Sequence, residues 1–326
     1  MELLLPIVLF LLGFALLIKG GDWFVDGATG LAHRFHLPEL LIGATVVSIG
    51  TTLPEVMVST LAAAEGTGGI AYGNAIGSII CNTSLIAALT MAIRPGQVDS
   101  RSLRLPMAFF LGAAVFYSVI AYAFGRFDRW VGIVLLCAFV CYMVLTIRQM
   151  KQHPDLAPAD AEEAQPEKER TLLMEIVLLV VGAACIAVGA NLLVDNGTII
   201  ASALGVPEAV IGLTMVALGT SLPELVTAIT ALAKGHSALS LGNIIGANLF
   251  NLVLVSGLAV TISPFQVPAE RLVGGFNSSL VIDIPVMFAV MLILCVPALK
   301  DGKLRRWQGV TLLCIYAAFN ILQFVL

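Results

Sequence analysis

Two glutamates stand in parts of the chain that carry no other charge. Glu55 ends the hexamer GTTLPE, and Glu224 ends the hexamer GTSLPE. Each lies within 25 otherwise uncharged residues, 40–64 and 209–233. A charged side chain at the centre of a membrane costs about 3 kcal/mol or more unless a partner offsets it, and neither segment contains a lysine or an arginine. We therefore expect the partner of each glutamate to be a cation taken from solution.

The same hexamers also fit a purely structural interpretation. Thr52 with Glu55, and Ser221 with Glu224, have the spacing of a capping box, in which the two side chains satisfy N–H groups at the start of a helix. In a soluble protein this interpretation would be preferred. In an apolar span it is disfavoured, because serine or threonine alone caps a helix without burying a carboxylate. The sequence therefore favours ion binding.

Both glutamates directly follow a proline that interrupts a helix. Pro54 has no N–H and clashes with the preceding turn, so the carbonyl of Gly50 loses its helical partner. Pro223 does the same to Gly219. Free backbone groups are tolerated within a membrane only where protein or a water-filled cavity satisfies them. We predict that each of these spans consists of two half-helices whose joint faces the interior of the protein.

Oxygen atoms dominate the polar side chains around these joints. Hydroxyl and amide groups lie in the hexamers and in the next apolar segment of each half, at Thr51, Thr52, Thr220, Ser221, Asn82 and Asn251. Ser78 lies one helical turn before Asn82 and shares its face. An all-oxygen set suits Ca²⁺, which takes about 6–8 oxygen ligands, and argues against zinc or copper. Two carboxylates balance one Ca²⁺ or several Na⁺, and ions that compete for one site can be exchanged.

The hexamers belong to an internal repeat with a constant offset of 169 residues. The offset aligns Glu55 with Glu224 and Asn74 with Asn243. From 25 to 55, 15 of 31 residues are identical to their offset partners, which chance does not produce. The chain therefore consists of two homologous halves.

The two halves are far more apolar than a soluble domain. The chain is 59% hydrophobic and 12% charged, with a mean hydropathy of +0.99. We predict an all-α integral membrane protein with a first five-helix repeat at 1–149, a cytoplasmic linker at 150–170 and a second five-helix repeat at 171–326. Ten apolar runs are about long enough to span a bilayer: 3–24, 38–64, 69–93, 105–124, 130–147, 172–201, 208–233, 237–263, 279–299 and 307–326.

An odd number of spans in each half makes the second half enter the membrane from the opposite side. This is the inverted-repeat design of many secondary transporters, which bind their substrates near the midplane. Loops after the odd-numbered spans contain 13 lysine and arginine residues, against three in the loops after the even-numbered spans. The positive-inside rule therefore places the linker in the cytoplasm. It places both termini on the extracytoplasmic side of the cell (inner) membrane.

The segments GTTLPE…GNAIGSIICN and GTSLPE…GNIIGANLFN resemble the alpha repeats of the calcium/cation antiporter superfamily, specifically those of the prokaryotic sodium/calcium exchangers. The resemblance covers both halves. It implies ten helices, exchange of Na⁺ for Ca²⁺ by alternating access, and ion sites between spans 2, 3, 7 and 8. It also implies a ligand set of the carboxylates Glu55 and Glu224, the hydroxyls of Thr51, Thr52, Thr220 and Ser221, the backbone carbonyls of Ser48 and Ala217, and the site-lining side chains Ser78, Asn82 and Asn251.

Two positions depart from the pattern of this family. Ala247 is the repeat partner of Ser78, where some exchangers keep a serine, and this puts the number of transported Na⁺ in question. Asn251 stands where the resemblance suggests that relatives requiring K⁺ carry an acidic residue.

Other functions remain open from the sequence. A H⁺/Ca²⁺ antiporter is one alternative, because buried carboxylates can carry protons. An intramembrane hydrolase is disfavoured, because an acid/base pair needs two different environments and these glutamates occupy equivalent positions. Broken helices at equivalent positions of two inverted halves favour alternating access, and they therefore disfavour a passive channel. We expect an ion antiporter and no enzyme, with no cofactor, and with Ca²⁺, Na⁺ and the lipid bilayer as partners. The chain lacks the basic stripe of nucleic-acid binding, and no obligate protein partner is evident.

Charged residues away from the hexamers receive structural interpretations. Lys19 and Asp22 lie one turn apart and are expected to pair. Asp26 and its repeat partner Asp195 are expected to serve capping or packing rather than ion binding.

Overall fold

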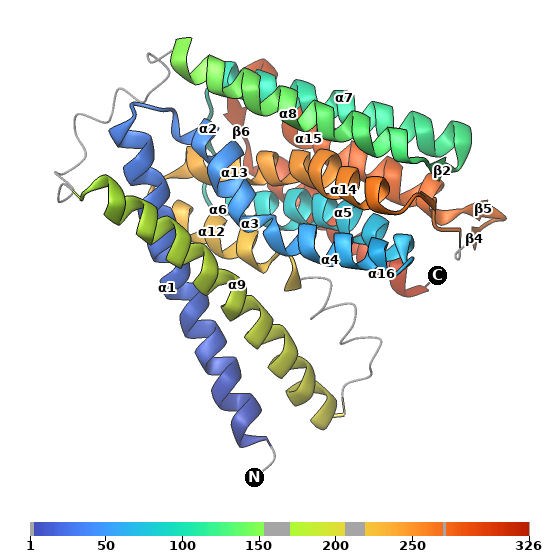
Figure 1. The fold of residues 1–326 in the computed structure, drawn as a ribbon, viewed down its shortest axis with the longest axis horizontal. Helices are drawn as coiled ribbons and strands as arrows, with labels where there is room; N and C mark the ends of the chain where they lie inside the picture. Colours follow the sequence, from blue (N-terminus) through green and yellow to red (C-terminus); the bar gives the residue numbers. More distant parts are fainter. Residues whose placement is uncertain (1–2, 153–169, 206–218, 270–271, 326) are drawn as a thin grey trace.

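The computed structural model describes residues 3–152, 170–205, 219–269 and 272–325, which form a bundle of helices with very short strands in the connections (Figure 1). Most of the predicted linker and the predicted ligand Ala217 lie outside the described residues. The elements before the linker are α1 (Leu4–Arg34), α2 (Glu39–Ile42), the π-helical turn η1 (Gly43–Val47), α3 (Ser48–Thr51), α4 (Leu53–Ala64), α5 (Gly68–Cys81), the π-helical turn η2 (Asn82–Ala87), α6 (Ala88–Ile93), β1 (Gly96–Gln97), α7 (Ser100–Phe124), β2 (Arg126–Phe127) and α8 (Arg129–Gln152). Those after it are α9 (Leu172–Ala203), α12 (Leu222–Ala233), α13 (Ser237–Phe250), the π-helical turn η6 (Asn251–Val255), α14 (Ser256–Ile262), β3 (Phe265–Gln266), β4 (Leu272–Val273), β5 (Phe276–Asn277), the π-helical turn η7 (Ser279–Asp283), α15 (Ile284–Asp301), β6 (Lys303–Leu304) and α16 (Arg306–Val325).

The helices identify a multi-pass membrane protein. Seven described helices are long and apolar enough to cross a membrane, and there are eight if the bent pair Glu39–Thr51 and Leu53–Ala64 counts as one span. Helix α12 is a shorter apolar helix, and the residues directly before Gly219 lie outside the described part. A total of ten spans therefore stays a prediction.

The protein buries several polar side chains and exposes many large apolar ones. Glu55, Glu224 and Asn82 have no exposed surface, whereas Met57 and Leu173 are 70% and 71% exposed. A soluble protein rarely exposes large apolar patches, but lipid solvates them readily. The burial pattern therefore agrees with a membrane environment.

Helices α1 and α9 form an antiparallel pair that slants across the other helices (Figure 1). A Cβ atom at Gly20 would lie 2.9 Å from the carbonyl oxygen of Gly182, and one at Gly13 would lie 2.8 Å from that of Gly189. The repeat offset aligns Gly13 with Gly182 and Gly20 with Gly189. Small residues thus let the two backbones touch, as in close helix packing in membranes. The equivalent helices of the two halves run in opposite directions.

Helix α13 also packs closely through glycines. A Cβ atom at Gly242 would lie 2.1 Å from the carbonyl oxygen of Leu40, and one at Gly246 would lie 2.3 Å from Oγ of Ser48. These two glycines therefore let α13 approach the first half of the chain closely. A Cβ atom at either of their repeat partners, Gly73 and Gly77, would meet no described atom within 4 Å.

The broken span predicted in the first half is present. The half-spans on either side of Thr52 meet at an angle of 47°. Pro54 lies in the first turn of α4, where a helical N–H has no intrahelical partner to lose. Pro223 occupies the same place in the first turn of α12. Each proline therefore lies in the first turn of a helix, directly before the glutamate of its repeat.

Two π-helical turns occur at equivalent positions of the repeat. Turn η2 begins at Asn82, and turn η6 begins at Asn251. A π-helical turn widens the helix locally and is frequently found at functional sites. The two halves thus distort the same helix at the same amide.

The connections gather at two ends of the bundle. Strand β1 pairs antiparallel with β6, which joins the loops after the third and ninth predicted spans. Strand β2 pairs antiparallel with β3, which joins the loops after the fourth and eighth. Figure 1 shows β2 and β6 toward opposite ends. Odd-numbered and even-numbered loops are therefore separated in these two pairings.

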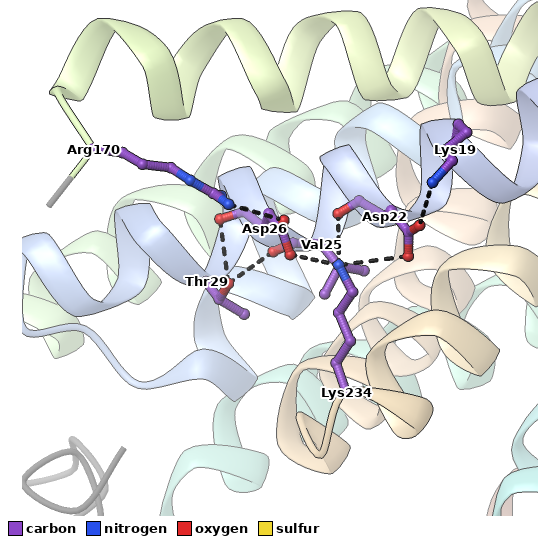
Figure 2. Close-up of polar contacts among 7 residues, drawn as sticks. All are labelled: Lys19, Asp22, Val25, Asp26, Thr29, Arg170 and Lys234. Atoms are coloured by element: carbon purple, nitrogen blue, oxygen red, sulfur yellow. Dashed lines mark hydrogen bonds and ion pairs between the residues drawn. The ribbon is translucent and has the colours of Figure 1, made fainter. Parts of the chain in front are cut away.

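A charge network ties α1 to the segments at the start of α9 and the end of α12 (Figure 2). The carboxylate of Asp26 contacts Lys234 Nζ, and it accepts a hydrogen bond from Arg170 at 3.3 Å. Lys234 Nζ also lies 3.5 Å from Asp22, whose carboxylate is 3.9 Å from Lys19 Nζ. The predicted pair of Lys19 and Asp22 is confirmed. Asp26 forms ion pairs with the side chains of Arg170 and Lys234.

Helix α1 continues to Arg34, well past the predicted end of the first span at residue 24. Arg34 Nε donates to the carboxylate of Glu175 on α9 at 2.8 Å. The charged end of α1 stays helical because its acidic and basic groups are paired with those of neighbouring segments.

The contact between α1 and α9 leads to a prediction about stability. In Gly20→Ala the new methyl group would lie 2.8 Å from the Cβ of Cys185, so the helices must separate. We expect a loss of about 1–3 kcal/mol, typical of overpacking. Thermal unfolding in detergent checks this, with Gly112→Ala as the control, because a Cβ at Gly112 meets no described atom within 4 Å. Equal melting temperatures for the two variants would contradict the prediction.

Candidate cation site

The two glutamates occupy equivalent places in the structure. Glu55 lies in the first turn of α4, and Glu224 lies in the first turn of α12. Neither side chain has any exposed surface. Pro54 and Pro223, the residues directly before them, line one small pocket, so the two first turns lie close together. The fold therefore brings together the two carboxylates that the sequence places 169 residues apart.

Both carboxylates lack protein partners among the described residues. All four carboxylate oxygens of Glu55 and Glu224 are buried without a hydrogen bond to the described part of the chain. None of the ion pairs found in that part involves them. Burying an ionised carboxylate in this way is very costly unless a cation compensates it. No described side chain supplies such a cation, which supports an ion from solution as the partner of the two glutamates.

The capping box does not form. Thr52 and Ser221 precede their helices with φ, ψ of −83°, −2° and −88°, 2°, and neither side chain caps its helix. An N-cap residue normally has extended backbone angles that turn its side chain onto the first N–H groups. Here the chain enters each half-helix from near-helical angles. The hydroxyls of Thr52 and Ser221 are instead buried without a described hydrogen-bond partner.

Two amides share this unsatisfied state. Asn82 and Asn251 have no exposed surface, and both polar atoms of each side chain lack a described hydrogen-bond partner. Ser78 is buried one turn before Asn82 on α5. Buried amides in native proteins are nearly always hydrogen-bonded. Six residues predicted as ligands from the sequence thus carry unpaired oxygen atoms in the core: Glu55, Glu224, Thr52, Ser221, Asn82 and Asn251.

The remaining hydroxyls are hydrogen-bonded to asparagines of the opposite half. Thr51 donates to Oδ1 of Asn243 at 3.1 Å, and Thr220 donates to Oδ1 of Asn74 at 3.4 Å. Thr51 also lies beside the Glu224 carboxylate. Sequence analysis aligned the two asparagines in the repeat but did not assign them to the site. Their position as amides in apolar segments, present in both halves, is the signal that could have identified them.

Of the two predicted backbone ligands, only Ser48 lies within the described residues. The carbonyl of Ser48 accepts the N–H of Thr52 at 3.0 Å and so keeps its helical hydrogen bond. Ala217 lies outside the described residues. The Ser48 hydroxyl donates to the carbonyl of Gly43 at 2.7 Å.

The available atoms suit a hard cation. The side chains provide two carboxylates, neutral hydroxyls and neutral amides, which are the ligands that Ca²⁺ and Na⁺ take in proteins. No group of three or more His, Cys, Asp or Glu residues that could hold a metal occurs in the described part of the chain. The site therefore differs from the nitrogen and sulfur sites of zinc and copper.

Helices α1 and α9 cover the two proline joints. A small pocket is lined by residues of both helices and of both proline segments, including Phe24, Thr51, Pro54, Ala183 and Pro223. The ring of Phe24 would lie 3.0 Å from a Cβ atom at Gly50.

Comparison with known proteins identifies the family. The chain matches the family model described as sodium/calcium exchanger protein over residues 5–148 and 174–325. It belongs to the sodium/calcium exchanger family. This exchanger is 31% identical over 350 residues to the sodium/calcium exchanger MaX1 of Methanosarcina acetivorans, which covers 97% of this chain and 98% of the relative. It is 36% identical over 292 residues to the inner membrane protein YrbG of Escherichia coli, which covers 89% of each.

The fold agrees with this assignment. A solved structure of the sodium-calcium exchanger NCX_Mj, soaked with 2.5 mM Na⁺ and 10 mM Sr²⁺, superimposes with a TM-score of 0.81 at 34% identity. The superposition covers 97% of this exchanger and 98% of that chain. Family and fold together make this protein a membrane transporter rather than an enzyme, which removes the hydrolase alternative. The cations are transported substrates rather than resident cofactors.

The unpaired carboxylates predict an unusual response of stability to mutation. Glu55→Gln should raise the thermal stability of the Ca²⁺-free protein, because it removes one of two uncompensated buried charges. It should also abolish the stabilisation by Ca²⁺ that mass action gives the wild type. Melting curves in detergent with Ca²⁺ or with a chelator measure both effects. Glu65→Gln is the control, since Glu65 is an exposed carboxylate just after α4. A variant that melts lower without Ca²⁺ and still responds to Ca²⁺ would contradict this assignment.

Proposed function

We propose that this exchanger is a secondary active antiporter that moves Ca²⁺ against Na⁺ by alternating access. One observation supports this most directly: Glu55 and Glu224 are fully buried in equivalent half-helices with no described protein cation beside them. Their combined charge of −2 is balanced by one Ca²⁺ or by Na⁺ ions at the same place. Because the two cations compete for one pair of carboxylates, loading one releases the other.

The proposed ligand set follows from the same geometry. The carboxylates of Glu55 and Glu224 bind both cations. Neutral oxygens complete the coordination, and these come from Thr51, Thr52, Thr220, Ser221, Ser78, Asn82, Asn251 and the backbone carbonyls of Ser48 and Ala217. The unpaired buried oxygens of six of these residues support the assignment. Ala247, the repeat partner of Ser78, has no side-chain oxygen. At this pair of positions only the first half of the chain therefore supplies a side-chain ligand.

The proposed topology has ten helices in two inverted repeats, 1–149 and 171–326, with a cytoplasmic linker at 150–170. The antiparallel packing of the equivalent helices α1 and α9 supports the inversion. The pairing of β1 with β6 and of β2 with β3 supports the alternation of loops between the two ends. Two halves related in this way can present one central site to either side of the membrane.

We place both termini outside the inner membrane and the basic loops in the cytoplasm. The excess of lysine and arginine in the odd-numbered loops supports this orientation. Arg34, Arg170 and Lys234, which belong to those loops, meet Glu175 and Asp26 in one network of ion pairs. The relative YrbG is named an inner membrane protein, which supports the choice of membrane.

A H⁺/Ca²⁺ antiporter is the second candidate. Two interacting buried carboxylates without a basic partner can also release their charge by taking up protons. Measuring Ca²⁺ uptake with either a Na⁺ gradient or a H⁺ gradient separates the two functions.

The test is Ca²⁺ uptake into proteoliposomes of purified protein. We expect an outward Na⁺ gradient to drive uptake, and an outward H⁺ gradient with choline on both sides to drive none. Glu55→Gln and Glu224→Gln should each lower uptake by about 100-fold or more, since leaving a buried charge unbalanced costs about 3–5 kcal/mol. Glu65→Gln should exchange like the wild type. Uptake driven by the H⁺ gradient alone would favour the second candidate, and near-normal exchange by either glutamine variant would refute the two-carboxylate site.

The neutral amide at Asn251 predicts exchange that does not need K⁺. An amide offers a carbonyl oxygen without charge, so it cannot balance an additional monovalent cation. We expect Na⁺-driven Ca²⁺ uptake to persist when choline replaces all K⁺, and Asn251→Asp to make uptake sensitive to K⁺ or to pH. Loss of wild-type uptake without K⁺, with recovery in millimolar K⁺, would show that the site holds a further cation.

A further inference from the structure

Asn74 and Asn243 link each half of the protein to the ion site of the other half. Thr51 of the first half donates to Oδ1 of Asn243, and Thr220 of the second half donates to Oδ1 of Asn74. The repeat offset aligns the two threonines and the two asparagines. The two hydrogen bonds are therefore one reciprocal interaction repeated across the pseudo-symmetric interface.

The orientation of the Asn74 amide is fixed by its other contacts. Its Nδ2 donates to the backbone carbonyl of Glu55 at 3.2 Å and to Oγ of Ser59 at 2.9 Å. A backbone carbonyl only accepts hydrogen bonds, so the atom facing it must be the NH₂ group. Oδ1 consequently faces Thr220. Asn74 thus holds Glu55 of its own half and a hydroxyl of the other half at the same time.

Asn243 is held in a different way. Its Oδ1 accepts from Thr51 at 3.1 Å and lies 3.4 Å from the Ser48 hydroxyl, while Nδ2 is buried without a described partner. One difference between the repeats accounts for the unpaired Nδ2. The repeat partner of Ser59 is Ala228, which offers no acceptor to Nδ2. Asn243 is therefore fixed mainly through its oxygen atom.

A hydroxyl group must be oriented before it can bind a cation. It has one hydrogen and two lone pairs, and the hydrogen repels a cation if it points at the ion. A fixed acceptor on the far side draws the hydrogen away and leaves the lone pairs for the ion. An amide oxygen does this without adding charge to the site.

We propose that Asn74 and Asn243 are positioning residues that turn the hydroxyls of Thr220 and Thr51 toward the transported cation. The inference rests on the proposed function, in which these threonines are ligands. Each asparagine acts across the repeat interface, so the coordination of the ion depends on the two halves meeting in register. Neither asparagine contributes an oxygen atom to the ion.

The test is a double-mutant cycle on Thr51 and Asn243. We expect Asn243→Leu to raise the KM for Ca²⁺ about tenfold with a smaller change in kcat, the scale of one net hydrogen bond. Thr51→Val should raise KM as well, and the double variant should be no worse than Thr51→Val alone, because both changes remove one interaction. Multiplied effects in the double variant would overturn the proposal.

The matched control is Asn248→Leu. Asn248 is an equally buried amide on the same helix, α13, but it donates to Thr83 at 2.7 Å rather than to a proposed ligand. Its loss should lower the melting temperature and leave KM unchanged, and its combination with Thr51→Val should be multiplicative. A rise in KM for Asn248→Leu equal to that of Asn243→Leu would show a general packing effect and refute a positioning role.

A second variant covers the case in which Asn243→Leu does not fold. Asn243→Asp keeps the acceptor oxygen, so Thr51→Val should raise KM by the same factor in this background as in the wild type. A Thr51→Val effect that disappears in the Asn243→Asp background would overturn the proposal.

Calcium binding in detergent, measured by calorimetry, separates failure of the inference from failure of the proposed function. Absence of Ca²⁺ binding by the wild type would refute the proposed function and the inference that rests on it. Binding that is weakened by Thr51→Val but unaffected by Asn243→Leu would refute the positioning role alone.

Discussion

The electrostatics of two buried carboxylates governs this protein. Glu55 and Glu224 lie in an interior that excludes water, and no described side chain balances them. A stable fold normally avoids such an arrangement. The free-energy cost of removing an ionised group from water is larger than the free energy gained from its interactions with neutral neighbours. The two glutamates are therefore a place where the fold gives up stability, and under the proposed function this loss is offset when a cation binds.

The rest of the structure makes this arrangement possible. The prolines lie in the first turns of α4 and α12, so the carboxylates lie there too, where N–H groups without intrahelical partners favour negative charge. Glycines at 242 and 246 let α13 approach α2 and η1 until backbone atoms nearly touch. Close approach brings the hydroxyls of one half within reach of the amides of the other. Packing and coordination are thus provided by the same helices.

Polar groups are satisfied very differently at the centre and at the end of the bundle. Around the glutamates, the hydroxyls of Thr52 and Ser221 and the amides of Asn82 and Asn251 have no hydrogen-bond partner within the described residues. At the end of α1, Asp22, Asp26 and Glu175 are all paired with lysine or arginine. The pairs of Asp22 and Asp26 are partly exposed and each contribute about 1 kcal/mol or less. Glu175 is itself buried and pairs with the partly exposed Arg34. They hold α1 to its neighbours without placing a protein cation near the ion site.

The sequence by itself determined the repeat, the helical membrane class, the broken span at Pro54 and the two carboxylates, because these follow from composition, periodicity and the covalent chemistry of proline. It disfavoured the capping box, and the structure confirms that neither Thr52 nor Ser221 caps its helix. The roles of Asn74 and Asn243 were decided only by tertiary structure. Thr51 and Asn243 are 192 residues apart, and no local pattern states that two such residues meet. Contacts of that range depend on how the two halves pack together.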